Sequence, residues 1–253
     1  MTKLTLKKKL YNKEAQFGTW CILPNPEIVS VLVASGLDYV LIDFEHSPVS
    51  FESAQKMVMA SHAQGKYAVS RVGKLEEVEI LRALDIKSDG IIVPHIESLK
   101  DVKEVVSYVK YYPEGNRGYS PYTYAGGYNV HKDYTKNANK NILLGIIIES
   151  QKGVDNLDEI LSSHDLDLVY LGAYDISISL GLAGQITHPK VVEVLDYCIE
   201  KITKAGKIAG AMYHTQKDYE QFKKQGVNFL VYKVDSLMIN EALKPVRELK
   251  GEK

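Results

Sequence analysis

Short, nearly continuous apolar runs recur along the chain, and segments with a helical spacing of apolar residues stand between them. Runs without polar alternation are typical of parallel strands that are buried on both faces. Eight runs predict strands, at residues 18–23, 39–44, 67–71, 90–94, 143–148, 168–172, 208–212 and 229–232. The segments between them predict helices, at residues 26–35, 51–64, 75–84, 99–108, 154–161, 191–204, 218–224 and 237–249.

This alternation predicts the fold class. Glycine followed by a polar residue precedes several strands, as at Gly65-Lys66 and Gly206-Lys207, which is typical of the helix-to-strand turn of a repeating α/β unit. Eight such units predict an α/β fold, a single-domain (β/α)8 TIM barrel over residues 1–253. The alternative is an open doubly wound sheet, although no Gly-x-Gly-x-x-Gly follows the first strand. Residues 1–16 are expected to form a short surface arm or helix with its lysines in solvent.

Composition and charge exclude several classes of protein. The 31 Lys and Arg residues balance 32 Asp and Glu residues, so no basic stripe favours a nucleic-acid partner. No apolar run is long enough to predict a membrane span, and the basic N-terminus is not followed by an apolar signal core. Cys21 and Cys198 fall in a predicted strand and helix, as core residues rather than a disulfide pair. We therefore expect a cytoplasmic protein that binds neither nucleic acid nor membrane.

Ionisable residues gather at the predicted carboxyl ends of the strands, which is where the active sites of such barrels lie. They are Asp43, Glu45 and His46 after the second strand, Arg71 at the end of the third, His95 after the fourth, Glu149 at the end of the fifth and Asp175 after the sixth. Each has a structural interpretation as a solvated strand end or a helix cap, and His95 is interpreted as a rim histidine with satisfied hydrogen bonds. Charges from different strands at one end favour a functional site.

Glu149 and Asp175 are the candidate metal ligands. Two carboxylates with open positions suit a hard divalent cation, Mg²⁺ or Mn²⁺, with Co²⁺ or Zn²⁺ as further candidates. A 2-oxo acid chelates such a cation through a carboxylate oxygen and its ketone oxygen, and the cation stabilises the enolate. Arg71 would add a second positive charge at that oxygen.

The remaining candidates handle protons and the substrate carboxylate. His46 titrates near neutral pH and is the candidate acid/base, with Asp43 or Glu45 orienting its ring. The backbone of Gly172 and Ala173 enters a helical turn and can offer N–H groups to a carboxylate.

At these residues the chain resembles the HpcH/HpaI aldolase family, the metal-dependent (class II) pyruvate aldolases. The matching elements include Asp43-Phe-Glu-His-Ser-Pro48, Tyr112-Pro-Glu-Gly-Asn-Arg-Gly118 and Gly172-Ala-Tyr-Asp-Ile-Ser177. The resemblance, to 2-dehydro-3-deoxyglucarate and 4-hydroxy-2-oxoheptanedioate aldolases among others, spans residue 17 to the last predicted helix. It implies a carbon–carbon lyase that cleaves or forms a 4-hydroxy-2-oxo acid from pyruvate, or a similar 2-oxo acid, and an aldehyde.

The resemblance also implies roles for individual residues. Glu149 and Asp175 would bind the metal, Arg71 would contact the keto oxygen, and His46 paired with Asp43 would serve as acid/base, with Glu45 supporting them. The backbone of Gly172, Ala173 and Tyr174 would hold the carboxylate. Members are commonly homo-oligomers, hexamers built from dimers that exchange a C-terminal helix, so a neighbouring subunit is an expected partner.

The chain departs from the family pattern in two places. Ile147 stands where many members carry a glutamine that reaches the substrate, and losing such a hydrogen bond costs about 1–3 kcal/mol. Residues 119–128, in the long connection 111–141, form a tyrosine-rich run where many members carry an arginine. This run predicts a less anionic, sugar-like or aromatic acceptor, or alternatively a subunit interface. The other long connection, residues 177–189, is also expected to be functional.

Three other functions stay open at this point. An acyl-CoA lyase of the citrate lyase β or malyl-CoA lyase type would use the same metal site, but no basic cluster for the CoA phosphates lies near the rim. A non-catalytic barrel that binds a metal and a 2-oxo acid is the alternative that Ile147 raises. A Schiff-base aldolase would need a desolvated lysine, and the one candidate, Lys233, is interpreted as a solvated rim residue.

Overall fold

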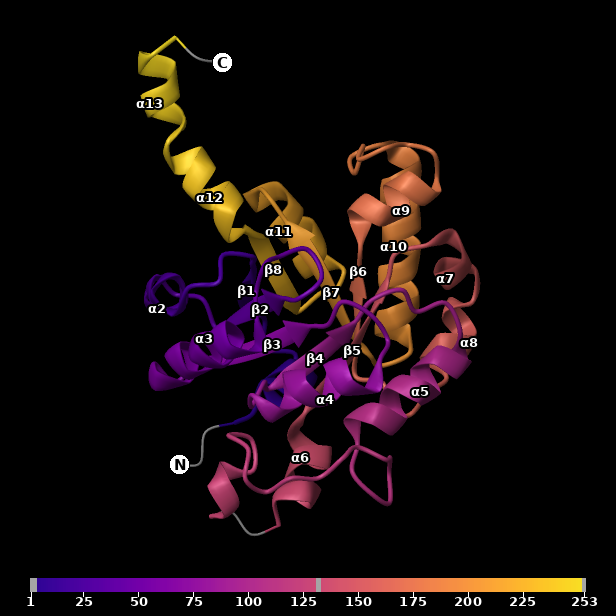
Figure 1. The fold of residues 1–253 in the computed structure, drawn as a ribbon. Coiled ribbons are helices and arrows are strands. Elements are labelled where there is room, and N and C mark those ends of the chain that lie inside the picture. Colours follow the sequence, from indigo (N-terminus) through magenta and orange to yellow (C-terminus); the bar gives the residue numbers. More distant parts are fainter. Residues whose placement is uncertain (1–3, 131–132, 252–253) are drawn as a thin grey trace.

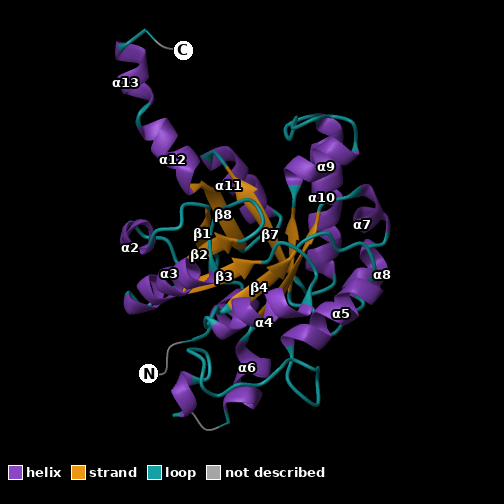
Figure 2. Ribbon diagram, in the orientation of Figure 1, coloured by secondary structure: helices purple, strands orange, loops and turns teal. Residues whose placement is uncertain are grey.

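Eight parallel strands pair in sequence order and close into a barrel, with the helices outside it (Figures 1 and 2). The computed structural model describes residues 4–130 and 133–251. The strands are β1 (Gln16–Cys21), β2 (Tyr39–Asp43), β3 (Tyr67–Arg71), β4 (Gly90–Val93), β5 (Leu143–Ile148), β6 (Leu168–Leu171), β7 (Ile208–Tyr213) and β8 (Phe229–Val234). The predicted (β/α)8 barrel is confirmed, and the open doubly wound sheet is wrong because β1 pairs with β8.

The strand residues are buried on both faces, which explains their continuous apolar sequence. Inside the barrel, aromatic and aliphatic side chains such as Tyr39, Ile92 and Phe229 form one cluster. Outside it, the opposite strand faces pack under the helices in two further clusters. Barrel closure is in register between Gln16 and Phe229, where the first and last strands meet.

The helices begin at sites that satisfy their free backbone N–H groups. Asn25, Ser50, Ser98 and Thr215 each accept such a bond through the side chain at an N-cap. In chain order the helices are α1 (Leu6–Tyr11), α2 (Pro26–Ala34), α3 (Phe51–Ala63), α4 (Glu77–Asp85), α5 (Leu99–Val109), the 3₁₀ turn η1 (Gly127–Asn129), α6 (Tyr134–Asn141), α7 (Gln151–Asp155), α8 (Leu157–Leu161), α9 (Ala173–Ser179), α10 (Pro189–Lys204), α11 (Gln216–Lys224), α12 (Asp235–Ala242) and α13 (Lys244–Leu249). Among the described residues, none of these helices has the length and apolarity to cross a membrane.

The helix α1 lies against the amino ends of the strands rather than on the surface alone. Leu6 and Leu10 are fully buried and join the cluster inside the barrel. The carbonyl of Leu10 accepts a hydrogen bond from Asn228 Nδ2, directly before β8. The lysines of this segment were predicted to lie in solvent, but Lys7 Nζ forms an ion pair with Asp167 Oδ2 at 2.8 Å. The expected arm is thus a short helix whose apolar side closes one end of the barrel.

We expect Leu10→Ala to lower the free energy of unfolding by about 2–5 kcal/mol, because it opens a cavity in the closed end of the barrel. Chemical denaturation monitored by circular dichroism measures this change. Leu249→Ala is the matched control, since Leu249 is 89% exposed in α13 and its truncation should cost less than about 0.5 kcal/mol. Equal effects of the two substitutions would contradict a structural role for α1.

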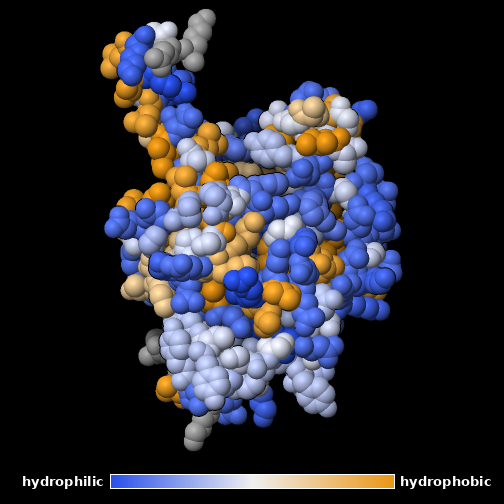
Figure 3. Space-filling view, in the orientation of Figure 1, coloured by the Kyte–Doolittle hydropathy of each residue, from blue (hydrophilic) through white to orange (hydrophobic). Residues whose placement is uncertain are grey.

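The end of the described chain forms an arm instead of the single predicted helix 237–249. The helix breaks at Leu243, two residues before Pro245, into α12 and α13, which project away from the barrel (Figure 1). Pro245 has no backbone N–H with which to continue the hydrogen bonding of α12, and it stands instead in the first turn of α13, where proline is favoured. The arm carries exposed apolar residues (Figure 3), namely Ile239, Leu243, Val246 and Leu249.

The base of this arm is tied to the barrel. Asp235, the first residue of α12, is buried, and its Oδ2 accepts the backbone N–H groups of Ile22 (3.1 Å) and Leu23 (3.0 Å) after β1. Burial raises the pKa of Asp235, and it outweighs the backbone hydrogen bonds, which lower that pKa. The start of α12 is therefore fixed relative to the carboxyl ends of the strands.

Candidate active site

A cavity of about 500 Å³ opens at the carboxyl ends of the strands. Eight of the residues predicted from the sequence line it: Asp43, His46, Arg71, Glu149, Gly172, Ala173, Tyr174 and Asp175. The ninth, Glu45, lies behind this wall and contacts Arg71. The structure thus brings the predicted residues of four separate segments to one place, while their roles stay predictions.

Arg71 is held in place by two carboxylates and one indole ring. Its Nε donates to Asp43 Oδ1 (3.0 Å) and its Nη2 to Asp43 Oδ2 (2.5 Å), which is the bidentate geometry that a guanidinium favours with a carboxylate. Its Nη1 lies 3.1 Å from Glu45 Oε2. The guanidinium carbon also stands 4.5 Å from the centre of the Trp20 ring. Arg71 is buried, so it presents a positive charge of fixed position to the cavity.

The relation between His46 and Asp43 differs from the one expected. Asp43 Oδ1 accepts the backbone N–H groups of Glu45 (2.9 Å) and His46 (3.1 Å) and is otherwise engaged by Arg71. The His46 side chain is 66% exposed, and its Nε2 lies 4.0 Å from Glu45 Oε1. Asp43 therefore shapes the turn that carries His46, and Glu45 is the carboxylate nearer to the ring.

Glu149 lies at the centre of a group of charged residues. Its Oε1 accepts the backbone N–H of His95 (2.7 Å) and lies 2.9 Å from Nδ1 of the same residue. Burial raises the pKa of the Glu149 carboxyl, and the nearby charges of Asp175 and Glu45 act in the same direction against the contacts from His95. Asp175 is exposed in the first turn of α9 and lines the same cavity.

His95 has a position that sequence reasoning did not foresee. It was interpreted as a rim histidine with satisfied hydrogen bonds, and its ring indeed has two carboxylate partners. Its Nε2 lies 2.9 Å from Glu45 Oε1 while Nδ1 faces Glu149, so the ring bridges the two acids. The backbone of His95 has a φ of 59°, a left-handed conformation that is uncommon for a residue with a Cβ and that no sequence motif announced.

The donor set fits a hard divalent cation. Glu149 is a partly desolvated carboxylate whose pKa is raised next to two further acids, so a cation would relieve both the burial of its charge and the mutual repulsion. Within residues 4–130 and 133–251, no three His, Cys, Asp or Glu residues are placed together to bind a metal. Glu149 and Asp175 stay the predicted ligands, and water and substrate oxygens would have to fill the remaining positions.

Several cavity residues were not predicted from the sequence as part of the site. Trp20 donates from Nε1 to the Tyr170 hydroxyl (3.0 Å), and the two rings pack edge to face. Met212 and, from the start of α12, Ser236 and Leu237 complete the wall. None of these residues belongs to a polar sequence motif. The one signal in the sequence was the position of Trp20 near the carboxyl end of a predicted strand.

Two other predicted candidates lie elsewhere. The tyrosine-rich run follows α5 and lies at the amino end of the barrel, where Tyr122 and Tyr124 line a cavity beside α3 and α4. Within one chain, Tyr122 and Tyr124 do not line the candidate active-site cavity. Their part in selecting the acceptor, or in a subunit interface, stays a prediction. Lys233 pairs with Glu241, a hydrogen bond that raises the pKa of its ammonium. A Schiff-base lysine needs the opposite shift, so this geometry disfavours that mechanism.

The model of the family HpcH/HpaI aldolase/citrate lyase matches residues 16–242, which is most of the chain. The chain belongs to the HpcH/HpaI family. It is an aldolase-type lyase, in line with its relatives of known name. The 5-keto-4-deoxy-D-glucarate aldolase of Shigella boydii serotype 18 is 32% identical over 224 residues, covering 88% of this chain and 87% of the relative.

Two solved structures resemble this barrel closely. The HpcH/HpaI aldolase from Desulfitobacterium hafniense DCB-2 superposes with a TM-score of 0.90 at 27% identity, covering 98% of this chain and 97% of that one. Citrate synthase SbnG superposes with a TM-score of 0.89 at 29% identity, covering 99% and 100%. The proteins that this chain resembles are therefore named for an aldolase in one case and for a synthase in the other.

In this HpcH/HpaI member, Gly172 is required by the position of Glu149. A Cβ at Gly172 would lie 2.7 Å from Glu149 Cβ and 3.2 Å from its Oε2. We expect Gly172→Ala to displace the Glu149 carboxylate, to lower stability by about 1–3 kcal/mol and to weaken binding of Mn²⁺. Calorimetric titration with Mn²⁺ and a thermal melt measure both effects.

Gly118→Ala is the matched control for this substitution. A Cβ there would make only ordinary contacts, at 3.5 Å or more, so stability and Mn²⁺ binding should match those of the wild type. Unchanged Mn²⁺ affinity in Gly172→Ala would contradict the proposed part of Glu149 in a metal site.

Proposed function

We propose that this chain is a divalent-metal-dependent aldolase that cleaves or forms a 4-hydroxy-2-oxo acid. Its donor would be pyruvate or a similar 2-oxo acid, and its acceptor an aldehyde. The observation that carries this proposal is the single cavity in which Glu149 and Asp175 lie with the fixed guanidinium of Arg71. The curated aldolase of Shigella boydii, at 32% identity, supports the reaction class.

The residues of the chain divide the work of the reaction. Arg71 stabilises negative charge on the donor's keto oxygen, and its bonds to Asp43 and Glu45 mean that it need not reorganise during the reaction. His46, with an exposed ring, moves protons between the donor or acceptor and water. The N–H groups of Ala173 and its neighbours in the first turn of α9 orient the donor carboxylate.

A divalent cation, Mg²⁺ or Mn²⁺, would be held by Glu149 and Asp175. When bound it would supply positive charge at the keto oxygen, which lowers the cost of removing a proton from the adjacent carbon. Mn²⁺ and Mg²⁺ suit two carboxylates better than a softer metal would, since the site offers oxygen donors. Ile147 lines the cavity without a hydrogen-bonding group, so it adds no side-chain hydrogen bond to the one that Arg71 would give that oxygen.

Proton exchange into pyruvate tests the donor half of this proposal. Proton NMR in D₂O should show loss of the pyruvate methyl signal with Mg²⁺ and no loss with EDTA, without any aldehyde. His46→Ala should slow exchange by about 10²- to 10⁴-fold, while His164→Ala, which changes an exposed histidine outside the cavity, should not. No exchange by the metal-loaded wild type would reject pyruvate as the donor.

A second candidate function is the condensation of an acyl-CoA ester. The observation that favours it is the 29% identity with citrate synthase SbnG over nearly the whole of both chains. Acetyl-CoA in the same exchange experiment separates the two functions. Metal-dependent deuteration of the acetyl group, with pyruvate left unchanged, would assign the CoA ester as donor.

We further propose a homo-oligomer in the cytoplasm. The exposed apolar residues of α12 and α13 support packing of the arm on a second copy, as the expected exchange of C-terminal helices requires. Both cysteines are free and buried, which suits a reducing compartment. Light scattering after size-exclusion chromatography gives the subunit number, and a monomeric mass would reject the oligomer.

A further inference from the structure

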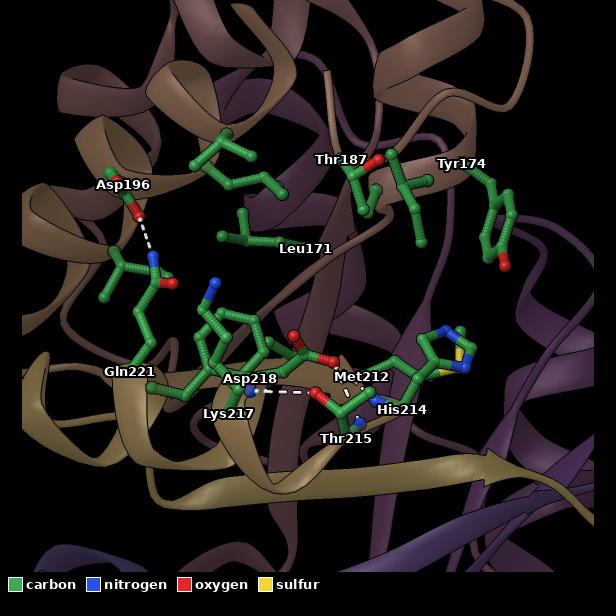
Figure 4. Close-up of a pocket in the computed structure, with 17 residues that line it drawn as sticks. Leu171, Tyr174, Thr187, Asp196, Met212, His214, Thr215, Lys217, Asp218 and Gln221 are labelled. Carbon is green, nitrogen blue, oxygen red and sulfur yellow. Dashed lines mark hydrogen bonds between the residues drawn. The ribbon is translucent and has the colours of Figure 1, made fainter. Parts of the chain in front are cut away.

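A second cavity of about 510 Å³ adjoins the candidate active site. It lies between α10, α11 and the connection that follows α9, and Figure 4 shows its lining. Four residues belong to the walls of both cavities: Leu171, Ala173, Tyr174 and Met212. The two spaces therefore meet at the ends of β6 and β7, and Ala173, in the turn assigned to the donor carboxylate, borders both.

The floor of the second cavity is apolar. It is formed by side chains of β6, α10, β7 and α11: Leu171, Val192, Leu195, Ile199, Ala211 and Phe222. A concave space of this size with an apolar floor and a few polar groups is typical of sites for small organic ligands. An alkyl chain or a ring would fill it better than a polar, strongly hydrated group.

The acidic groups around this cavity are already engaged. Asp218 Oδ2 accepts the backbone N–H groups of His214 (3.1 Å) and Thr215 (2.9 Å). Asp196 Oδ1 accepts hydrogen bonds from Gln221 (3.3 Å) and from Gln225 (2.6 Å), the first of which closes the far end of the cavity in Figure 4.

Two nitrogen groups at the same cavity are not engaged. His214 Nε2 is buried and has no hydrogen-bond partner among the described residues, although a buried unpaired polar atom normally costs stability. Lys217 forms no ion pair within the described part of the chain. His214 stands on the side of Tyr174, where the cavities join (Figure 4). The free groups therefore favour a ligand that carries a hydrogen-bond acceptor or a negative charge.

We propose that this second cavity is a subsite for the substituent of the acceptor aldehyde. It takes an apolar chain or ring of about six carbons, with a hydrogen-bond acceptor such as a carboxylate at its end. The aldehyde carbon stays near Arg71 in the first cavity, and the chain passes between Tyr174 and Met212 into the second. This inference rests on the proposed aldolase function and names the class of acceptor.

The test compares acceptors of different length with pyruvate as donor. Hexanal should be used with a higher kcat/KM than glycolaldehyde by the wild type. Val192→Trp, which fills the second cavity from α10 and leaves the lining of the first unchanged, should lower the ratio of the two kcat/KM values by about 10- to 100-fold. Val31→Trp is the matched control on α2, where Val31 is 64% exposed, and should leave the ratio unchanged.

A charge substitution tests the polar end of the subsite. Lys217→Met should lower kcat/KM for 6-oxohexanoate relative to hexanal by about three- to fivefold, the range expected of an exposed charge pair. Lys224→Met, on the same helix but outside the cavity, should leave this ratio unchanged. A folded Val192→Trp protein with an unaltered ratio of hexanal to glycolaldehyde would overturn the subsite.

Failure of the subsite and failure of the aldolase function give different results. Donor exchange in D₂O needs no acceptor, so its absence in the wild type would reject the proposed function alone. In that case saturation-transfer NMR with hexanoate decides the subsite directly. Binding to the wild type that is lost in Val192→Trp would support it, while no binding, or equal binding to both proteins, would overturn it.

Discussion

Glu149→Gln is expected to slow metal-dependent donor exchange by about a thousandfold or more. The substitution keeps the size of the side chain under Gly172 but removes the negative charge of a proposed metal ligand. Loss of a cation's charge at a developing negative oxygen removes several kcal/mol of stabilisation, and about 4 kcal/mol corresponds to this factor. The exchange rate from proton NMR and the Mn²⁺ affinity from calorimetric titration should fall together.

In the metal-free protein, Glu149→Gln is expected to raise thermal stability. Because burial raises the folded-state pKa of Glu149 above its unfolded value, the stability from its neutral form is present at low pH and lost as pH rises through the folded pKa. A glutamine stays neutral throughout. With EDTA present, Glu149→Gln should therefore melt higher than the wild type at pH 7.5, with a smaller difference at pH 4.

A matched control separates the charge of Glu149 from glutamate replacement in general. Glu104→Gln changes a residue on α5 that accepts a hydrogen bond from Tyr108 and does not line the cavity. Its exchange rate and Mn²⁺ affinity should equal those of the wild type. Full metal-dependent exchange by Glu149→Gln would contradict the proposed metal site even if pyruvate is the donor.

Arg71→Met is expected to damage both stability and catalysis. Removing the guanidinium leaves the buried carboxylate of Asp43 without its charged partner, a change that costs about 3–5 kcal/mol, and it removes one of the partners of Glu45. It also removes the fixed positive charge at the keto oxygen, which should slow donor exchange by about 10²- to 10³-fold. Denaturation curves and exchange rates measure the two effects on one preparation.

Two further variants interpret that result. Arg71→Lys keeps the charge but not the two-pronged geometry, so its stability should recover more than its exchange rate. Arg82→Met is the matched control, since Arg82 stacks 4.2 Å from the centre of the Phe51 ring and should contribute about 1 kcal/mol without affecting exchange. Equal exchange by Arg71→Met and the wild type would remove Arg71 from the mechanism.

The strands were predictable because of where a barrel buries them. Both faces of each strand are covered, so the apolar runs are continuous and their ends agree with the observed ones to within about two residues. Helix faces were harder to predict. The sequence of the predicted helix 75–84 has apolar residues three apart, at Leu75, Val78, Leu81 and Leu84, but Val78 is 54% exposed. The buried residues of this helix are Ile80, Ala83 and Leu84. An α-helix has 3.6 residues per turn, so residues spaced strictly by three do not stay on one face.

The site was predictable where the chain order places residues at strand ends, and not where long-range packing decides. Arg71 and Glu149 followed from the fold class and the position of their strands. The bridge that His95 makes between Glu45 and Glu149 depends on a left-handed backbone and on two other segments, which no local pattern encodes. Likewise, only the topology showed that the long tyrosine-rich connection runs to the other end of the barrel from the cavity.

Two hydrogen bonds of α1 can form only after much of the chain has been synthesised. The Tyr11 hydroxyl donates to Asp167, 156 residues later in the chain, and the Leu10 carbonyl accepts a hydrogen bond from Asn228, 218 residues later. At about 5–20 residues per second, a ribosome needs on the order of 10–40 s to translate the interval up to Asn228. Until then the cluster that buries Leu6 and Leu10 lacks its last members, Phe229 and Val231, so these leucines stay exposed to a chaperone or to another nascent chain.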